Sequence, residues 1–298
     1  MNVLANRFAS VGLGLFLAAA GGAVPGAVRS AEAVEVRRVS ERLIPFAPGG
    51  EVKIGDKNGR LVVEAWPRNE VRVQVTRVVR AEGATKAEEL MKHLTSDVEV
   101  RKDRIDIESR FPKRTESIGI WDILGRKVAS LQINYYVQVP KETSLVLETS
   151  NGEVRVRGTN GRIASTTTNG DIRVEEIKGN VVLATTNGEV HVTNVSGGVS
   201  ARTTNGTIIA QVLKVTAQGE VELETTNGNV EAYFPSDLRA TLEASTTNGR
   251  VTIAFPIVRE GVMTSKSIRG TIQGGGAKIS LATTNGNVEV RRIGENRP

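Results

Sequence analysis

Three carboxylates occur at one position of a repeated motif, and their types and spacing could support chemistry. Glu153, Asp171 and Glu189 each lie two residues after an asparagine, and successive members are 18 residues apart. If the repeated units stack, these side chains come within about 5 Å of one another from rung to rung. Glycoside hydrolysis uses two carboxylates facing one sugar, about 5–9 Å apart according to mechanism. The column therefore raises the hypothesis of a carbohydrate-active enzyme.

Basic residues accompany this column and weaken the catalytic interpretation. Arg155, Arg173 and His191 lie two residues after the three carboxylates. Neighbouring cations keep a carboxylate ionised, whereas a general acid needs a raised pKa. We therefore expect a charge-paired, solvent-facing ridge, with weak binding of a cation or a glycan as the alternative.

The composition argues against several other kinds of site. The 298 residues include no Cys and two widely separated His, His93 and His191, so we expect no disulfide, thiol nucleophile, metal centre or cofactor. Gly274-Gly275-Gly276 lacks the following Gly-Lys-Ser/Thr of a phosphate loop. Lys and Arg exceed Asp and Glu by 39 to 33, but this excess is diffuse and few aromatic residues interleave with it. The pattern predicts no nucleic-acid partner.

The carboxylates belong to units marked by Thr-Asn-Gly or Ser-Asn-Gly. The asparagines of these units advance by 18, 18, 18, 22, 21 and 37 residues, a spacing typical of stacked repeats. Apolar residues at the third and fifth positions after each Asn predict a strand with one buried face, and a later apolar pair predicts a second strand. The seven marker residues are Asn151, Asn169, Asn187, Asn205, Asn227, Asn248 and Asn285.

Two architectures fit this pattern. Asn-Gly reverses a strand at little steric cost, because Asn tolerates a positive φ and Gly adopts it freely. Each unit is then either one coil of a β-solenoid or one hairpin of an antiparallel meander. The solenoid is favoured because two inward residues per strand fill the narrow inside of a coil but make a poor free-standing sheet face. In register, the Thr and Asn side chains would form ladders along the stack.

Three segments are predicted along the chain. Residues 1–33 have the pattern of a secretory signal peptide, in which Arg7 precedes an apolar run of about ten residues, too short to span a bilayer. Residues 34–148 carry strand patterns without the repeat and one short helix over 85–94, and would cover the open end of the stack while continuing into it. Residues 149–298 form the solenoid. We expect an exported protein, periplasmic or on the cell surface, with no stable transmembrane segment once the signal is removed.

Several motifs together resemble the bacterial DUF4097-type family of adhesin-like proteins with a toastrack-like β-helix. They are Phe46-Ala-Pro-Gly-Gly50, Asn58-Gly59, Trp66-Pro67, Asn134-Tyr-Tyr-Val-Gln-Val-Pro140, the Thr-Asn-Gly units and Gly274-Gly-Gly276. The resemblance covers the chain from about residue 45 to residue 293. It implies an all-β, right-handed, single-stranded β-solenoid on an exported protein. It supplies no catalytic residues, and a fold does not by itself assign a function.

Two stretches outside the repeat are candidate binding surfaces. Residues 117–124 form an apolar segment around Trp121, which would either contact a protein or membrane partner or fold over the open end of the solenoid. The insertion over 256–276 is basic and could reach an acidic partner from one side of the stack. Its basic residues are Arg259, Lys266 and Arg269.

The sequence thus predicts a non-catalytic, exported β-solenoid that binds envelope polysaccharide or another cell-surface component through many weak contacts. One alternative is a periplasmic scaffold or regulator that binds a protein or membrane partner through Trp121. The other is a carbohydrate-active β-helix enzyme that uses the column of Glu153, Asp171 and Glu189.

Overall fold

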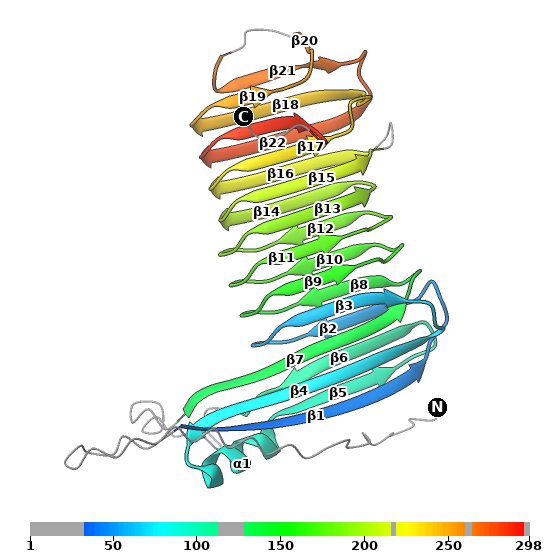
Figure 1. The fold of residues 1–298 in the computed structure, drawn as a ribbon, viewed down its shortest axis with the longest axis vertical. Coiled ribbons are helices and arrows are strands. Elements are labelled where there is room, and N and C mark those ends of the chain that lie inside the picture. Colours follow the sequence, from blue (N-terminus) through cyan, green and yellow to red (C-terminus); the bar gives the residue numbers. More distant parts are fainter. Residues whose placement is uncertain (1–32, 113–127, 216–218, 260–263, 295–298) are drawn as a thin grey trace, which may run out of the picture.

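The computed structural model describes residues 33–112, 128–215, 219–259 and 264–294. Figure 1 shows a column of short strands that widens at one end, where three longer strands and the helix lie. Neighbouring coils pair through parallel strands, so the β-solenoid is confirmed and the antiparallel meander is wrong. The predicted signal peptide and Trp121 lie outside the described residues, apart from Ala33 at the end of the signal.

Two sheets form the column, and each coil contributes one strand to each sheet. In spatial order the first sheet contains β1 (Ala33–Pro45), β4 (Glu70–Glu82), β7 (Val128–Pro140), β3 (Leu61–Trp66), β9 (Val154–Arg157), β11 (Ile172–Glu175), β13 (Val190–Ser196), β15 (Ile208–Lys214), β17 (Val230–Phe234), β23 (Val288–Arg292) and β19 (Val251–Ile253). The second contains β20 (Val258–Arg259), β21 (Ser267–Ile272), β18 (Ala240–Asn248), β22 (Ala277–Asn285), β16 (Glu220–Asn227), β14 (Val199–Asn205), β12 (Val181–Ala184), β10 (Ile163–Thr166), β8 (Ser144–Glu148), β2 (Glu51–Gly55), β6 (Arg104–Arg110) and β5 (Thr95–Val100).

The 18-residue unit keeps neighbouring coils in register. Val154 lies beside Ile172, which lies beside Val190, and all three side chains point into the narrow core and are fully buried. Because side chains alternate between the two faces of a strand, the residues between them face solvent. The same spacing therefore builds both the dry interior and the columns of like positions on the outer face.

The marker asparagines form one continuous ladder along the column. Each side-chain amide donates from Nδ2 to Oδ1 of its neighbour at 2.8 Å, giving six hydrogen bonds that link all seven residues. In spatial order the ladder runs Asn151, Asn169, Asn187, Asn205, Asn227, Asn285 and Asn248. The predicted Asn ladder is confirmed, and each of its five interior amides donates one hydrogen bond and accepts another within an otherwise exposed row.

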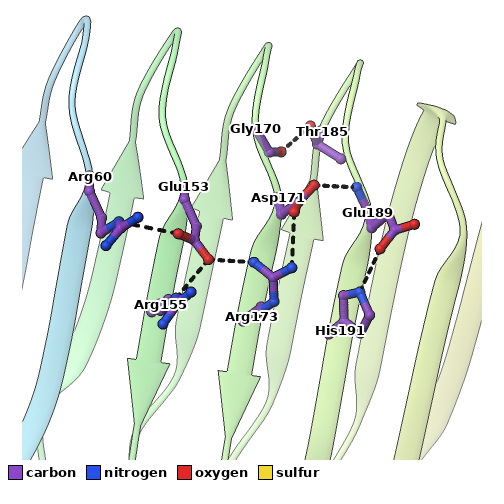
Figure 2. A network of polar contacts seen from close by, with 9 residues as sticks. All are labelled: Arg60, Glu153, Arg155, Gly170, Asp171, Arg173, Thr185, Glu189 and His191. Carbon is purple, nitrogen blue, oxygen red and sulfur yellow. Dashed lines mark hydrogen bonds and ion pairs between the residues drawn. The ribbon is translucent and has the colours of Figure 1, made fainter.

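The Thr and Gly of each marker have separate roles. The threonine two residues before each Asn is buried. In every marker unit except the first, its hydroxyl donates to a glycine carbonyl of the adjacent coil, as Thr185 does to Gly170 at 3.1 Å (Figure 2). In the first unit the Thr149 hydroxyl has no hydrogen-bond partner among the described residues. The glycine allows the coils to approach, since a Cβ added at Gly188 would lie 2.1 Å from the Gly170 carbonyl oxygen. No other residue fits such a position without moving the backbone.

The order of the coils in space departs from their order in the chain at both ends. Strand β22, near the end of the chain, lies between β16 and β18, and β23 lies between β17 and β19. At the other end, β2 lies between β6 and β8, and β3 lies between β7 and β9. Coil stacking thus extends to strands well before residue 149. The coil of β2 and β3, which comes first in the chain, therefore lies between strands that come later. The coil of β22 and β23, which comes last, lies between two earlier coils.

Different elements close the two ends. Helix α1 (Ala84–His93) packs on β1 and β4 and buries Ala87, Leu90 and Met91, so the predicted helix is confirmed to within one residue at each end. At the far end the insertion forms the antiparallel hairpin β20–β21 along the edge of β18. No helix within the described ranges is long and apolar enough to span a bilayer.

Candidate functional site

The structure brings the predicted ridge together on the outer face of the first sheet, and its first carboxylate, Glu153, is surrounded by guanidinium groups (Figure 2). Glu153 contacts Arg155 Nε at 2.6 Å, Arg60 Nε at 3.2 Å and the Arg173 guanidinium. Only 17% of its side chain is exposed. Three arginines therefore share one carboxylate, and Arg60 is a member of this cluster that the repeat pattern did not indicate.

The other two carboxylates of the ridge are also occupied. Asp171 Oδ2 lies 3.0 Å from Arg173 Nη2, while its Oδ1 accepts the backbone N–H of Glu189 at 2.9 Å. Glu189 Oε2 lies 2.9 Å from His191 Nε2. Burial lowers the pKa of Arg173, but the charges of Glu153 and Asp171 outweigh it and raise that pKa overall. Each carboxylate of the ridge is thus already engaged by a basic side chain, which suits a binding surface better than a general acid.

The basic insertion lies at the opposite end of the column from α1, far from β7 (Figure 1). Arg269 Nη2 contacts Glu243 Oε2 at 3.0 Å, and Lys266 Nζ donates to the Thr247 carbonyl at 2.8 Å. Arg259 is the last residue of β20. The structure thus separates the insertion from the ridge, so the candidate residues form two sites and not one.

A groove that the sequence did not predict opens beside the ridge. It has a volume of about 580 Å³ and crosses the outer face of the first sheet from β1 over β4, β7 and β3 to the start of β9. Its side chains are mostly uncharged and polar, with an arginine towards each end and the half-buried side chain of Tyr136 among them. They include Arg37, Thr76, Gln132, Asn134, Tyr136, Arg60 and Glu153.

Hydrogen bonds hold the groove in shape. Asn134 Oδ1 accepts the backbone N–H of Arg60 at 2.9 Å, and Asn58 Nδ2 donates to the Leu131 carbonyl at 2.6 Å. The Tyr136 hydroxyl donates to Glu64 Oε2 at 2.6 Å, and this hydrogen bond raises the pKa of Tyr136. A ligand would therefore meet side chains that are already oriented, which lowers the entropic cost of binding.

A buried polar cluster lies beneath the groove. Asp56 takes the motif position that Thr occupies in later coils; it is 8% exposed, and Ser109 donates a hydrogen bond to its Oδ1. Its Oδ2 has no hydrogen-bond partner among the described residues. The Tyr135 hydroxyl donates to Ser96 at 2.8 Å and lies 2.9 Å from Ser109 Oγ. Burial raises the pKa of Asp56, and it raises that of Tyr135 to about 12.

The Asp56 carboxyl should make stability depend on pH. Because its pKa is raised by burial in the folded protein, the native state binds more protons than the unfolded state, and stability falls as pH rises through the folded pKa. We expect Asp56→Asn to gain unfolding free energy relative to the wild type over the pH range that begins at about 4, the ordinary pKa of Asp, and extends upward through the raised one. Urea unfolding across that range measures the gain. Asp103→Asn, at an exposed turn, is the control, and a gain that is flat or shrinks with pH would contradict the assignment.

The described residues contain no group of three or more His, Asp or Glu that could hold a metal ion.

Comparison with known families then identifies the architecture. The family model described as Toastrack DUF4097 matches residues 141–291. This chain belongs to the Toastrack family. The match spans β8 to β23 and confirms the resemblance drawn from the Thr-Asn-Gly units, while the groove lies mainly on residues that precede the Toastrack match.

Solved structures with a similar arrangement have low sequence identity to this Toastrack chain. A "putative cell adhesion protein" from Clostridium sporogenes is 9% identical with a TM-score of 0.38, and covers 86% of this chain and 100% of its own. A "putative adhesin" from Bacteroides fragilis is 11% identical with a TM-score of 0.39, over 86% and 97%. A "putative lipid binding protein" from Parabacteroides distasonis is 10% identical with a TM-score of 0.24, over 86% and 96%. Comparison with proteins of curated function gives no match.

Proposed function

We propose that this protein is a non-enzymatic, exported β-solenoid that binds envelope polysaccharide or another cell-surface component in the groove. The observation that carries the proposal is the lining of the groove, in which amide, hydroxyl and guanidinium groups surround the aromatic side chain of Tyr136. Export rests on the predicted signal peptide of residues 1–33 and agrees with the lack of cysteine.

The chemistry of the lining suits a saccharide. Gln132 and Asn134 offer both donors and acceptors, as Thr76 does through its hydroxyl, and sugar hydroxyl groups need both. Tyr136 adds an apolar ring with a polar tip, which can pack against the carbon-bound face of a sugar ring. An open groove that crosses several strands can accommodate an extended polysaccharide chain. Compact cofactors, in contrast, bind in deeper and more apolar pockets.

The charges favour binding over hydrolysis. Glu153 is the carboxylate that lines the groove, and three arginines contact it. A glycosidase of the common two-carboxylate kind needs a second carboxyl group across the sugar and a raised pKa on the acid. In the ridge, the neighbouring carboxylate Asp171 is itself held by Arg173 and by the backbone N–H of Glu189, which supports a non-catalytic role.

Replacing Tyr136 tests the proposal. The chain offers a matched control in Tyr233, which lies on the first sheet away from the groove and whose hydroxyl also bonds a glutamate, Glu231, at 3.0 Å. We expect Tyr136→Ala to weaken binding to an envelope polysaccharide fraction or to array glycans by about tenfold, as loss of a central aromatic contact does. Tyr233→Ala should bind like the wild type. Equal effects of the two variants, or no binding by the wild type, would contradict the proposal.

A further inference from the structure

We infer that the groove selects acidic glycans, with Arg37 and Arg60 as the residues that bind uronate carboxylates. This inference rests on the proposed function and names its ligand class. Strands β1, β4, β7 and β3 are consecutive in the sheet, with Arg37 on β1 and Arg60 immediately before β3. The two arginines are thus three strand spacings apart, roughly 14 Å. Uncharged polar side chains from β4 and β7 lie between them.

At the β1 end, the guanidinium of Arg37 is available to a ligand. Its side chain is 59% exposed, and its contact with Glu35 is long, at 3.4 Å. Arg80 holds the same carboxylate more closely, at 2.7 Å, and its hydrogen bond keeps the pKa of Glu35 below the usual value. Glu35 therefore stays ionised and paired when Arg37 turns to a ligand, so the exchange costs little.

At the β3 end, the guanidinium of Arg60 is also available to a ligand. Its side chain is 58% exposed and contacts Glu153 at 3.2 Å, while Arg155 reaches that carboxylate at 2.6 Å and Arg173 contacts it too. Three guanidinium groups thus converge on one carboxylate that is itself shielded from solvent. Arg173 is shared with Asp171, so three arginines face two carboxylates, and Arg60 is the arginine of this cluster that lines the groove.

Two guanidinium groups at this spacing favour a ligand that carries several carboxylates along a sugar chain. The planar fork of Arg matches a carboxylate with two parallel hydrogen bonds, which an ammonium or amide does not supply. The amides of Gln132 and Asn134 between the two arginines can bind sugar hydroxyls. A recessed, polar groove also fits an extended oligosaccharide better than a flat lipid surface, although anionic headgroups carry the same charge.

The experiment compares acidic and neutral chains of the same length. Oligogalacturonate and hyaluronan oligosaccharides are titrated at low and high salt against neutral galacto-oligosaccharide, with phosphatidylglycerol vesicles as a separate arm. The test variant is Arg37→Gln/Arg60→Gln. After this change Glu35 still contacts Arg80, and Glu153 still contacts Arg155. The control is Arg202→Gln/Arg110→Gln, which removes two exposed arginines of the second sheet that lie outside both candidate binding surfaces.

We expect the wild type to prefer at least one acidic chain, with weaker binding at high salt. The groove variant should lose about tenfold or more in affinity for that chain and little for the neutral one, and the control should stay within about twofold. Equal wild-type affinity for acidic and neutral chains, no effect of the groove variant, or binding to vesicles alone would overturn the inference. Tyr136-dependent binding of other glycans without these results would leave the proposed function standing, whereas no glycan binding at all would overturn both.

Discussion

Deleting residues 277–298 should open the solenoid within the stack instead of shortening it at one end. Strands β22 and β23 supply the only pairing between the β16–β17 coil and the β18–β19 coil in the described part of the chain. Burial of four of their side chains contributes about 1.5–3 kcal/mol each to folding stability. We therefore expect the free energy of unfolding to fall by roughly 6 kcal/mol or more. The four side chains are Ile279, Leu281, Val288 and Val290. Urea unfolding and hydrogen exchange measure the loss.

Hydrogen exchange distinguishes this result from simple fraying. Removal of the interleaved coil should expose the amides of both β16 and β18, which flank the vacated slot. A synthetic peptide of residues 277–298 should restore their protection, and a scrambled peptide should not. If β18 remained as protected in the deletion variant as in the full chain, the interleaved order of the coils would be wrong.

Gly188→Ala should destabilise the protein through one methyl group. The Gly188 φ lies outside the left-handed region, so the cost comes from space and not from backbone conformation. The new Cβ would lie 2.1 Å from the Gly170 carbonyl oxygen and 2.5 Å from its carbon. These are backbone atoms of a coil that is hydrogen-bonded on both sides, and they cannot move alone. We expect a loss of about 3 kcal/mol or more in unfolding free energy, the upper range for overpacking.

Gly55→Ala is the matched control for this substitution. Gly55 also has a φ outside the left-handed region and lies in strand β2, but the nearest atom to an added Cβ is the flexible Glu108 carboxylate oxygen at 3.4 Å. We expect a change within about 1 kcal/mol, as at sites with room. Similar losses in the two variants would show that strand glycines matter for flexibility or propensity, and not for the close approach of the coils.

The repeat made the regular part of the fold predictable. An 18-residue unit with fixed inward positions determines the strand pairs, the Asn ladder and the packing of Val154, Ile172 and Val190. Local helix propensity predicted both ends of α1 to within one residue. The order of the coils was not predictable, because every coil carries the same motif and each can pair with any other. The 37-residue step before Asn285 was the sole hint of the returning chain.

The groove was less predictable than the ridge because its residues are far apart in the chain. Tyr136 reaches it only because β7 inserts between β4 and β3, and no local pattern encodes that insertion. Arg60 joins Glu153 across 93 positions through the pairing of β3 with β9. One signal was available: Asp56-Lys-Asn-Gly59 matches the Thr-Thr-Asn-Gly units with a carboxylate in the buried position, which marks an atypical coil beneath the groove.

Mapping the bound ligand shows whether the groove is the binding site. Hydrogen exchange on the whole protein, with and without a saturating envelope polysaccharide, reports which strands the ligand covers. We expect new protection at residues 58–62, 74–78 and 132–136, which adjoin in the groove. Protection confined to the second sheet or to the β20–β21 hairpin would contradict it.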